Sequence, residues 1–477
     1  MELDDTVVDQ WERLARTCFR HKSGSTADFS NYEGFDVLET WRSNHAEFAR
    51  FKLTKSERPS SGGRLFVLKH FIPQRGSHES VYAAYHQPSS LWPREVRNLR
   101  HVRAVLEEGY SRSFAHTLVP YVAGSYAEPH FALVLPFISG DNYKRRILHA
   151  SNDRKGNVFL DGIRLNARFV GTCNAHQDMF NTRFNYRADA FQQREVQHSL
   201  LKENIARVIY DLKPTCREFV KKDNADQLGG GNEQTYSIEP VFRYISSVLN
   251  INLDQRLREI RDLEKGLCEE EEFQHGDCNG LNMIKNKLID FEDFGYYPWT
   301  QDLSHNCIVI GLGTNAILQH RDFIYFVQAF LAIRAAYLTG DLNEGRTVES
   351  FTNGRYGTYV GEKMAGNRYS DFLASFFHRS TEKNLQLAAS YSRNERGEQT
   401  FDIRSSLSQL YHVVLELTPQ DFTQCSQPTQ VRELFYATGK LFNELGITRV
   451  DEYVLDGIKS GRTTGSAIAG GRPAFRH

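Results

Sequence analysis

The chain has 477 residues, 40% of them apolar and 25% charged, which is the composition of an ordinary globular protein with two or three domains. Its formal net charge of −1 gives no sign of a surface for nucleic acid or for an anionic membrane, so we expect neither partner. Seven scattered cysteines without C-x-x-C spacing argue against a zinc site or a disulfide framework and favour a reducing, cytoplasmic location.

Residues 1–138 predict a helical N-terminal extension, residues 1–34, followed by a small mixed α+β lobe. The first 22 residues are acidic at their start, lack the apolar core of a secretory signal, and carry apolar positions at helical spacing. Strands are expected in three segments: 35–53, 63–72 and 131–138. A helix is expected over residues 91–109, because Pro93 suits its first turn and Gly109 its end.

Residues 139–450 predict a larger, mainly helical lobe. Helices are expected over residues 238–267 and through most of residues 303–449. Two apolar stretches, 307–318 and 323–338, are too short and too interrupted to span a bilayer, so we interpret them as buried core helices.

Three polar segments lie outside this pattern. Residues 151–236 show no clear periodicity and are interpreted as an insertion. The four glutamates 269–272 predict a solvated charge run at a helix end. Residues 451–477, which end in a Gly- and Ser-rich stretch, predict a flexible tail.

Oxygen-bearing side chains crowd into the stretch FQHGDCNGLNMIKNKLIDFEDFG, residues 273–295. Met283–Ile284 is expected to pair with Leu288–Ile289 across Lys-Asn-Lys, and this minimal hairpin would bring Asp277, Asn282 and Asp290 to one rim. The mutual repulsion of the carboxylates in this stretch is costly unless a cation lies among them. Phosphoryl transfer uses such a rim, because one carboxylate orients the attacking hydroxyl while an amide oxygen and a second carboxylate hold Mg²⁺.

A lysine upstream completes the chemistry of this pattern. Lys69 follows an apolar pair on an expected strand, and Glu95 lies on the expected helix that comes next. A lysine that binds nucleotide phosphates is commonly held by a carboxylate on the neighbouring helix. The lysine, the helix glutamate, the H-G-D-x₄-N stretch and the I-D-F stretch occur in the order that such a site requires.

The chain resembles the aminoglycoside phosphotransferase/choline kinase family, which has a two-lobed, protein-kinase-like α+β fold. The resemblance covers roughly residues 35–310 and is carried by six motifs: VLK (67–69), REVRNL (94–99), LVLPFISG (133–140), HGDCNGLN (275–282), LIDFED (288–293) and QDLS (301–304).

The resemblance implies a role for each matching residue. Asp277 would be the catalytic base, Asn282 and Asp290 the magnesium ligands, and Lys69 and Glu95 the ion pair that positions the phosphates of ATP. The remaining roles fall to six positions: His275 and Asp302 would support the catalytic loop, the backbone around Leu135 and Phe137 would bind adenine, and Ser43 and Asn44, in the turn 41–48, would overlie the phosphates.

Several alternatives stay open at this point. Asp293 rivals Asp290 as a metal ligand, because the interval from Asn282 to Asp290 is short. Glu79 rivals Glu95 as the partner of the lysine. The turn 41–48 has no glycine, so phosphate binding by its backbone is less well supported.

These features predict a kinase that uses ATP and Mg²⁺ to phosphorylate a hydroxyl of a small molecule. The acceptor stays open among aminoglycosides, other antibiotics, choline-like amines, sugars and nucleosides, and the oligomeric state is not predicted. Two alternatives are a kinase that acts on a polypeptide and a nucleotide-binding pseudokinase scaffold. The short connection from Asp290 to Asp302 speaks against the first, and the intact set of motif residues speaks against the second.

Overall fold

The computed structural model describes most of the chain. The described residues are 5–20, 32–43, 45–55, 64–73, 81–228, 238–267, 271–306, 320–341, 355–365, 428–448 and 452–460, together with single positions between 375 and 386. None of the helices within these ranges is both long enough and apolar enough to cross a membrane.

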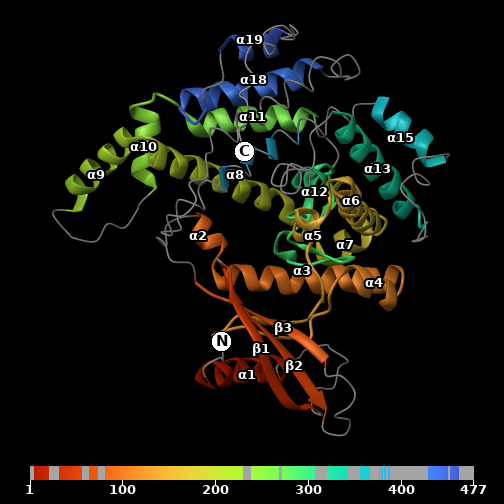
Figure 1. The fold of residues 1–477 in the computed structure, drawn as a ribbon. Helices are drawn as coiled ribbons and strands as arrows, with labels where there is room; N and C mark the ends of the chain where they lie inside the picture. The colour runs from red at the N-terminus through yellow and green to blue at the C-terminus, as the bar shows by residue number, and fades with distance from the viewer. Residues whose placement is uncertain are drawn as a thin grey trace. The chain divides into compact units, whose positions relative to one another are not determined.

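A five-stranded antiparallel sheet is the main β-structure (Figure 1). Its strands, in the order β1-β2-β3-β5-β4, are β1 (Tyr32–Arg42), β2 (Ala46–Lys55), β3 (Arg64–Phe71), β5 (Ala132–Pro136) and β4 (Gly124–Tyr126). The pairing places Lys69 of β3 between Phe48 of β2 and Leu133 of β5, so this lysine lies in the middle of the sheet. The three strand segments expected from the sequence are therefore confirmed.

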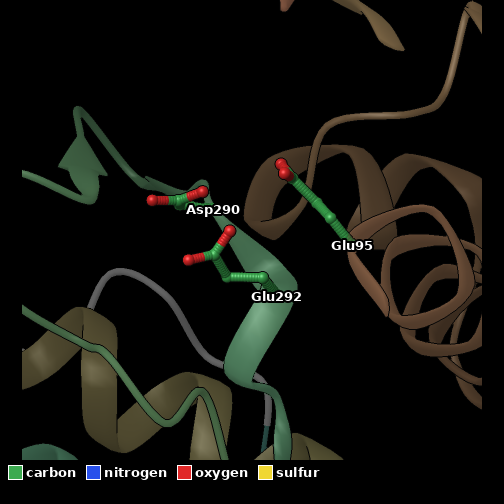
Figure 2. Close-up of side chains that lie close together, drawn as sticks. All are labelled: Glu95, Asp290 and Glu292. Carbon is green, nitrogen blue, oxygen red and sulfur yellow. The ribbon is translucent and has the colours of Figure 1, made fainter. Parts of the chain in front are cut away.

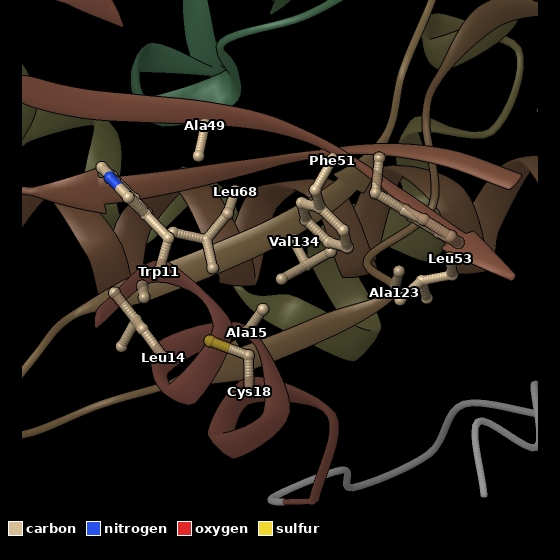
Figure 3. Close-up of a cluster of buried hydrophobic side chains, with 12 residues drawn as sticks. Trp11, Leu14, Ala15, Cys18, Ala49, Phe51, Leu53, Leu68, Ala123 and Val134 are labelled. Atoms are coloured by element: carbon tan, nitrogen blue, oxygen red, sulfur yellow. The ribbon is translucent and has the colours of Figure 1, made fainter. Parts of the chain in front are cut away.

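Helix α1 (Asp5–Arg20) covers one face of the sheet, and Figure 3 shows the apolar side chains between them. The helix contributes Trp11, Leu14, Ala15 and Cys18, and Leu68 of β3 lies in the same cluster. The expected N-terminal helix is thus present, and it forms part of the core of the sheet.

Helix α3 (Pro88–Gly109) contacts both β3 and β5. The indole Nε1 of Trp92 donates to the carbonyl oxygen of Ala132 at 2.8 Å, which fixes the helix to β5. Consecutive residues of a strand point to opposite faces, so Leu68 enters the core with α1 while Lys69 points toward α3. The predicted helix over residues 91–109 is confirmed, but it starts three residues earlier at Pro88, so Pro93 lies inside the helix and not in its first turn as expected.

The remaining elements are mostly helical, as the sequence predicts. The helices are α2 (Val81–Tyr85), α4 (Arg112–Leu118), α5 (Tyr143–His149), α6 (Asn152–Asn174), α7 (Gln177–Phe184), α8 (Tyr186–Leu212), α9 (Pro214–Leu228), α10 (Glu239–Ser247), α11 (Leu253–Leu267), α12 (Gln301–Asn306), α13 (His320–Leu338), α15 (Arg355–Ala365), α18 (Pro428–Glu444) and α19 (Glu452–Ser460). The short strands β6 (Glu271–Gln274) and β9 (Gly295–Pro298) pair with each other, as do β7 (Met283–Ile284) and β8 (Lys287–Leu288), and η1 (Phe291–Asp293) is a single 3₁₀ turn.

The chain divides into two compact units. The first comprises Met1–Ala190, Phe273–Tyr296 and Tyr337–Asp341, and the second comprises Phe191–Glu272, Tyr297–Ala336 and Leu342–His477. This division differs from the predicted lobe boundary at residues 138–139, because the stretch around Asp277 lies in the same unit as the sheet. The α+β class is confirmed, and an antiparallel sheet with a mostly helical remainder is consistent with a kinase-like fold.

The expected helix over residues 238–267 is two helices. Asn250 adopts a left-handed conformation with φ 54°, and the amide of Ile251 donates back to the carbonyl oxygen of Ile245 at 3.1 Å. Such a closing bond ends a helix, and asparagine tolerates the required positive φ. The sequence pattern did not reveal this break, because apolar residues recur at helical spacing on both sides of it.

Two further expectations were wrong. Part of the predicted tail is the helix α19, whose Leu455 and Ile458 are buried; residues 461–477 lie outside the described residues. In the predicted solvated glutamate run, Glu272 belongs to β6, is buried, and accepts a hydrogen bond from Nε of Arg334 at 2.8 Å. A burial that depends on a partner 62 residues away is not visible in the local sequence.

Residues 152–228, for which no element is predicted, form the four helices α6 to α9. Helix α6 lies in the first unit and buries Phe159, Ile163 and Phe169. The polar majority of this segment masks the apolar positions that drive its folding. The proposed turn at Gly229–Gly231 lies outside the described residues.

Substitution Phe51→Ala should lower the free energy of unfolding by about 3–5 kcal/mol, because a fully buried ring would leave a cavity. Phe51 stacks on Phe35 with ring centroids 4.5 Å apart and on Phe66 at 5.7 Å. Urea denaturation would measure the loss. The matched control is Leu38→Ala on β1, where 46% exposure predicts a change within about 0.5 kcal/mol. Equal effects of the two variants would contradict the assigned core.

Candidate functional site

Lys69 joins two carboxylates that are far apart in the sequence. Its Nζ lies 2.7 Å from Oε2 of Glu95 on α3 and 2.6 Å from Oδ1 of Asp290, which follows β8. Lys69 is 9% exposed and Glu95 is 1% exposed. The ion pair expected between Lys69 and Glu95 is therefore present, and it extends to Asp290.

The charges of this group depend on one another. Burial disfavours the charged form of Lys69, but the nearby charges of Asp290 and Glu95 outweigh burial and raise its pKa above the ordinary value. Burial also raises the pKa of Glu95, against the opposing effect of the Lys69 charge. Each ionised group therefore needs its partners to remain charged in the folded protein.

A third carboxylate, Glu292, completes a cluster with Glu95 and Asp290. One carboxylate oxygen from each residue lies within 4.8 Å of those of the other two, and Figure 2 shows the three side chains directed toward a common space. Burial and the charge of Asp290 raise the pKa of Glu292 well above its usual range. Such a set of oxygen donors fits a hard divalent cation such as Mg²⁺. The sequence analysis assigned no role to Glu292.

The loop that carries Asp277 is tied to the hairpin that precedes Asp290. Nδ2 of Asn282 donates to Oδ2 and to the backbone oxygen of Asp277, both at 3.0 Å. The amide of Ile289 donates to the carbonyl oxygen of Asn282, also at 3.0 Å. Asp277 and Asn282 are thus in contact, and Asp290 directly follows the residue that is bonded to Asn282 at the open end of the hairpin.

The hairpin itself is one residue tighter than expected. Met283 pairs with Leu288 and Ile284 with Lys287, so the turn holds two residues instead of three. Lys285 adopts a positive φ of 54° in this turn. Two-residue turns match the twist of paired strands, which accounts for the change of register.

His275 supports the same loop from its buried side. Its Nε2 donates to the carbonyl oxygen of Ile289 at 2.9 Å, and burial lowers its pKa. Gly276 follows with φ 88°, and a Cβ there would lie 2.1 Å from the carbonyl oxygen of Asp293. Only glycine allows the loop to approach the backbone of Asp293 this closely.

The turn after Asp290 is held by α3. Nδ2 of Asn98 donates to the carbonyl oxygen of Phe291 at 2.8 Å. Nη1 of Arg94 lies 3.4 Å from Oδ1 of Asp293. Arg94 and Asn98 flank Glu95 on the helix, and Asn98 lies three residues on, which places it on the same face as Glu95. The sequence analysis missed both roles, although this spacing could have indicated Asn98.

Asp290 and Asp293 have different partners. Asp290 contacts Lys69, whereas Oδ1 of Asp293 accepts a hydrogen bond of 2.5 Å from Oη of Tyr85. Burial raises the pKa of Asp293, while Arg94 and Tyr85 act in the opposite direction. Each carboxylate thus has a cationic partner, Lys69 for Asp290 and Arg94 for Asp293, and the choice of Asp290 as the metal ligand stays a prediction.

Some backbone groups that were expected to bind the nucleotide already form hydrogen bonds within the protein. The amide of Ser43 donates to the carbonyl oxygen of Ala46 at 2.8 Å, and the Ser43 hydroxyl also bonds to the backbone of Ala46. The amide of Phe137, just after β5 and Leu135, donates to the carbonyl oxygen of Leu65 at 3.0 Å. These groups serve the sheet, so phosphates and adenine would have to bind other backbone groups nearby. Asn44 and Glu79 lie outside the described residues.

Asp302 lies in the second unit, fully buried in the first turn of α12. Its expected support of the Asp277 loop stays a prediction.

Comparisons with known proteins give distant likenesses in structure alone. Neither a protein-family model nor a curated protein sequence matches the chain. Among solved structures, the chain is similar to an ethanolamine kinase from Plasmodium vivax, with 10% sequence identity, a TM-score of 0.38, and coverage of 80% of this chain and 82% of that one.

Substitution Lys69→Met should lower the free energy of unfolding by roughly 3–5 kcal/mol at pH 7, because Glu95 would remain buried without its cation. Glu95 would then have to bind a proton on folding, so its folded-state pKa would exceed its unfolded value. The loss should therefore shrink as the pH falls and should disappear below about pH 4, where Glu95 is protonated in the unfolded state as well. Urea denaturation at several pH values would measure it.

Two control variants sharpen this measurement. Lys69→Met combined with Glu95→Gln should recover much of the stability, since neither buried charge is left. Lys52→Met, a partly exposed lysine on β2, should be close to neutral. A loss for Lys69→Met that does not change with pH would count against the buried ion pair.

Proposed function

We propose that this protein is a kinase that uses ATP and Mg²⁺ to phosphorylate a hydroxyl group of a small molecule. The observation that carries the proposal is the convergence of Glu95 and Asp290 on Lys69. Asp277 and Asn282 adjoin the same hairpin, one hydrogen bond apart. Lys69, its two carboxylate partners and the Asp277–Asn282 pair belong to one unit, which supports a role in phosphoryl transfer.

Each residue has a role that its surroundings allow. Lys69 would bind the nucleotide phosphates, held in place by Glu95. Asp277 would orient the acceptor hydroxyl and take its proton, since its side chain is partly exposed at the loop. Asn282 holds Asp277 through Nδ2, which leaves the amide oxygen as the atom that would face a metal.

The donor set also supports the use of a divalent ion. Asp290 and Glu292 supply carboxylate oxygens from one short turn, and Asn282 lies across the hairpin from it. These residues would hold a Mg²⁺ ion, which would supply positive charge beside the nucleotide phosphates. The raised pKa of Glu292 is consistent with a carboxylate whose cation binds together with the substrate.

A nucleotide-binding scaffold without turnover is the second candidate. The internal bonds of Ser43 favour it, because the turn that would cover the phosphates uses its own amide and hydroxyl. Both candidates predict that the folded protein is stabilised by ATP with Mg²⁺ more than by either alone. Only the kinase consumes ATP, so a screen of hydroxylated metabolites and antibiotics for acceptor-dependent ATP consumption separates the two.

Substitution Asp277→Asn should lower turnover by about 10²–10⁴-fold while leaving nucleotide binding intact, because the amide cannot take the proton of the acceptor. Steady-state kinetics with the acceptor found in the screen, together with ATP titration, would measure both quantities. Asp178→Asn on α7 serves as the control for loss of a carboxylate in the same unit. Wild-type rates in the Asp277 variant would remove this residue from the mechanism.

Substitution Asp290→Ala should weaken Mg²⁺-dependent ATP binding more than Asp293→Ala does. The reason is that Asp290 shares a cluster with Glu95 and Glu292, whereas Asp293 is bound to Tyr85 and Arg94. Calorimetric titration of each variant with ATP, at low and at saturating Mg²⁺, would rank the two residues. The opposite order would move the metal site to Asp293.

A further inference from the structure

The segment between β3 and α3 contains the short helix α2, Val81–Tyr85, followed by His86. The segment runs from the strand of Lys69 to the helix of Glu95. None of the predicted roles in the site involves α2. Tyr85 and His86, two consecutive residues at its end, nevertheless contact two different parts of the site.

Tyr85 contacts the turn that follows Asp290. Its Oη donates to Oδ1 of Asp293 at 2.5 Å, across 208 residues of sequence. Arg94 reinforces this contact from α3, because its guanidinium lies 3.6 Å from the centre of the Tyr85 ring and its Nη2 donates to the Tyr85 carbonyl oxygen at 2.9 Å. The same guanidinium approaches Asp293. The three side chains thus form one closed group.

His86 contacts the turn between β1 and β2. Its ring stacks on the ring of His45, with centroids 4.5 Å apart and planes inclined by 17°. His86 is 8% exposed, so the stack is buried on that side. His45 is itself anchored, since its carbonyl oxygen accepts from the amide of Ile72 at 3.0 Å, just after β3.

We infer that Tyr85 and His86 are positioning residues: they tie the turn between β1 and β2 to the turn that carries Asp290 and Glu292. The inference rests on the proposed function, in which the first turn covers the nucleotide phosphates and the second holds the metal ion. Tyr85 acts through Asp293, and His86 acts through His45.

The geometry explains why such a tie would matter. Asp293 lies three residues after Asp290, and its backbone is already pressed against Gly276 beside Asp277. A side chain that fixes Asp293 therefore fixes the spacing between the metal ligands and the proposed base. Without the Tyr85 hydroxyl, the carboxylate of Asp293 would lose its shortest hydrogen bond and would be held less firmly, by Arg94 at 3.4 Å.

Hydrogen–deuterium exchange of the ligand-free protein tests the tie itself. Tyr85→Phe removes only Oη and keeps the ring beneath Arg94. Loss of a hydrogen bond to a carboxylate should speed exchange of the amides of residues 291–294 by about tenfold. Tyr126→Phe on β4 is the control for loss of a tyrosine hydroxyl in the same unit and should leave these amides unchanged. Equal exchange in the two variants would overturn the role of Tyr85.

Mn²⁺ titration followed by electron paramagnetic resonance tests whether Tyr85 and His86 position the metal-binding and phosphate-binding groups. A merely structural role would not change Mn²⁺ binding and Mn²⁺-ATP binding differently in the two variants. With or without ATP, Tyr85→Phe should weaken Mn²⁺ binding by about tenfold, as loss of an outer-shell partner does. His86→Leu should leave Mn²⁺ binding without ATP unchanged and weaken binding of Mn²⁺-ATP by about threefold, and His86→Phe, which can still stack on His45, should restore it. The inference would be overturned if His86→Phe did not restore Mn²⁺-ATP binding. It would also be overturned if Tyr85→Phe and the control Tyr126→Phe bound Mn²⁺ with equal affinity.

The two arms separate this inference from the proposed function. A wild-type protein that binds neither Mn²⁺ nor Mn²⁺-ATP would overturn the proposed function and the positioning role together, while the exchange experiment would still decide whether Tyr85 fixes the turn. Normal Mn²⁺-ATP binding by the wild type and by all variants would leave the function standing and would overturn the inference alone.

Discussion

A single buried ammonium group organises the candidate site. Lys69 lies in the centre of the sheet and is nearly inaccessible to water, so its charge requires partners within reach. Glu95 and Asp290 supply them from a helix and from a loop that is 221 residues away in the sequence. The Nζ atom of Lys69 thereby couples two positions, that of α3 relative to the sheet and that of the turn after β8. Loss of that charge would affect folding and the proposed chemistry together.

The turn from Asp290 to Phe294 is the second constraint. Asn98 binds its backbone from α3, Gly276 packs against it from the Asp277 loop, and Tyr85 binds its last carboxylate from α2. Three separate segments therefore determine where the carboxylates of this turn point. The acidic residues can therefore lie close together in spite of their mutual repulsion. Each accepts a hydrogen bond from a neighbouring donor or lies in the cluster that would hold a cation.

The local elements of the first unit follow from the sequence to a large extent. Continuous apolar runs mark β3 and β5, and apolar residues at helical spacing that end at Gly109 mark α3. The failures have two origins. Glu272 is buried by Arg334, a contact across 62 residues that the local pattern does not contain. Asn250 interrupts a continuous periodicity and the hairpin after Met283 closes through a two-residue turn, and both are local backbone conformations that hydrophobic spacing does not specify.

By itself, the sequence determined which chemical groups are present and in what order: a lysine on a strand, a glutamate on the next helix, and an Asp, Asn and Asp around a short hairpin. It named Asp290 as the metal ligand and kept Asp293, three residues further on, as a rival. Only the tertiary structure distinguished them, by placing Asp290 against Lys69 and Asp293 against Tyr85. Partners of this kind are decided by side-chain packing between segments about 200 residues apart, which spacing along the chain does not encode.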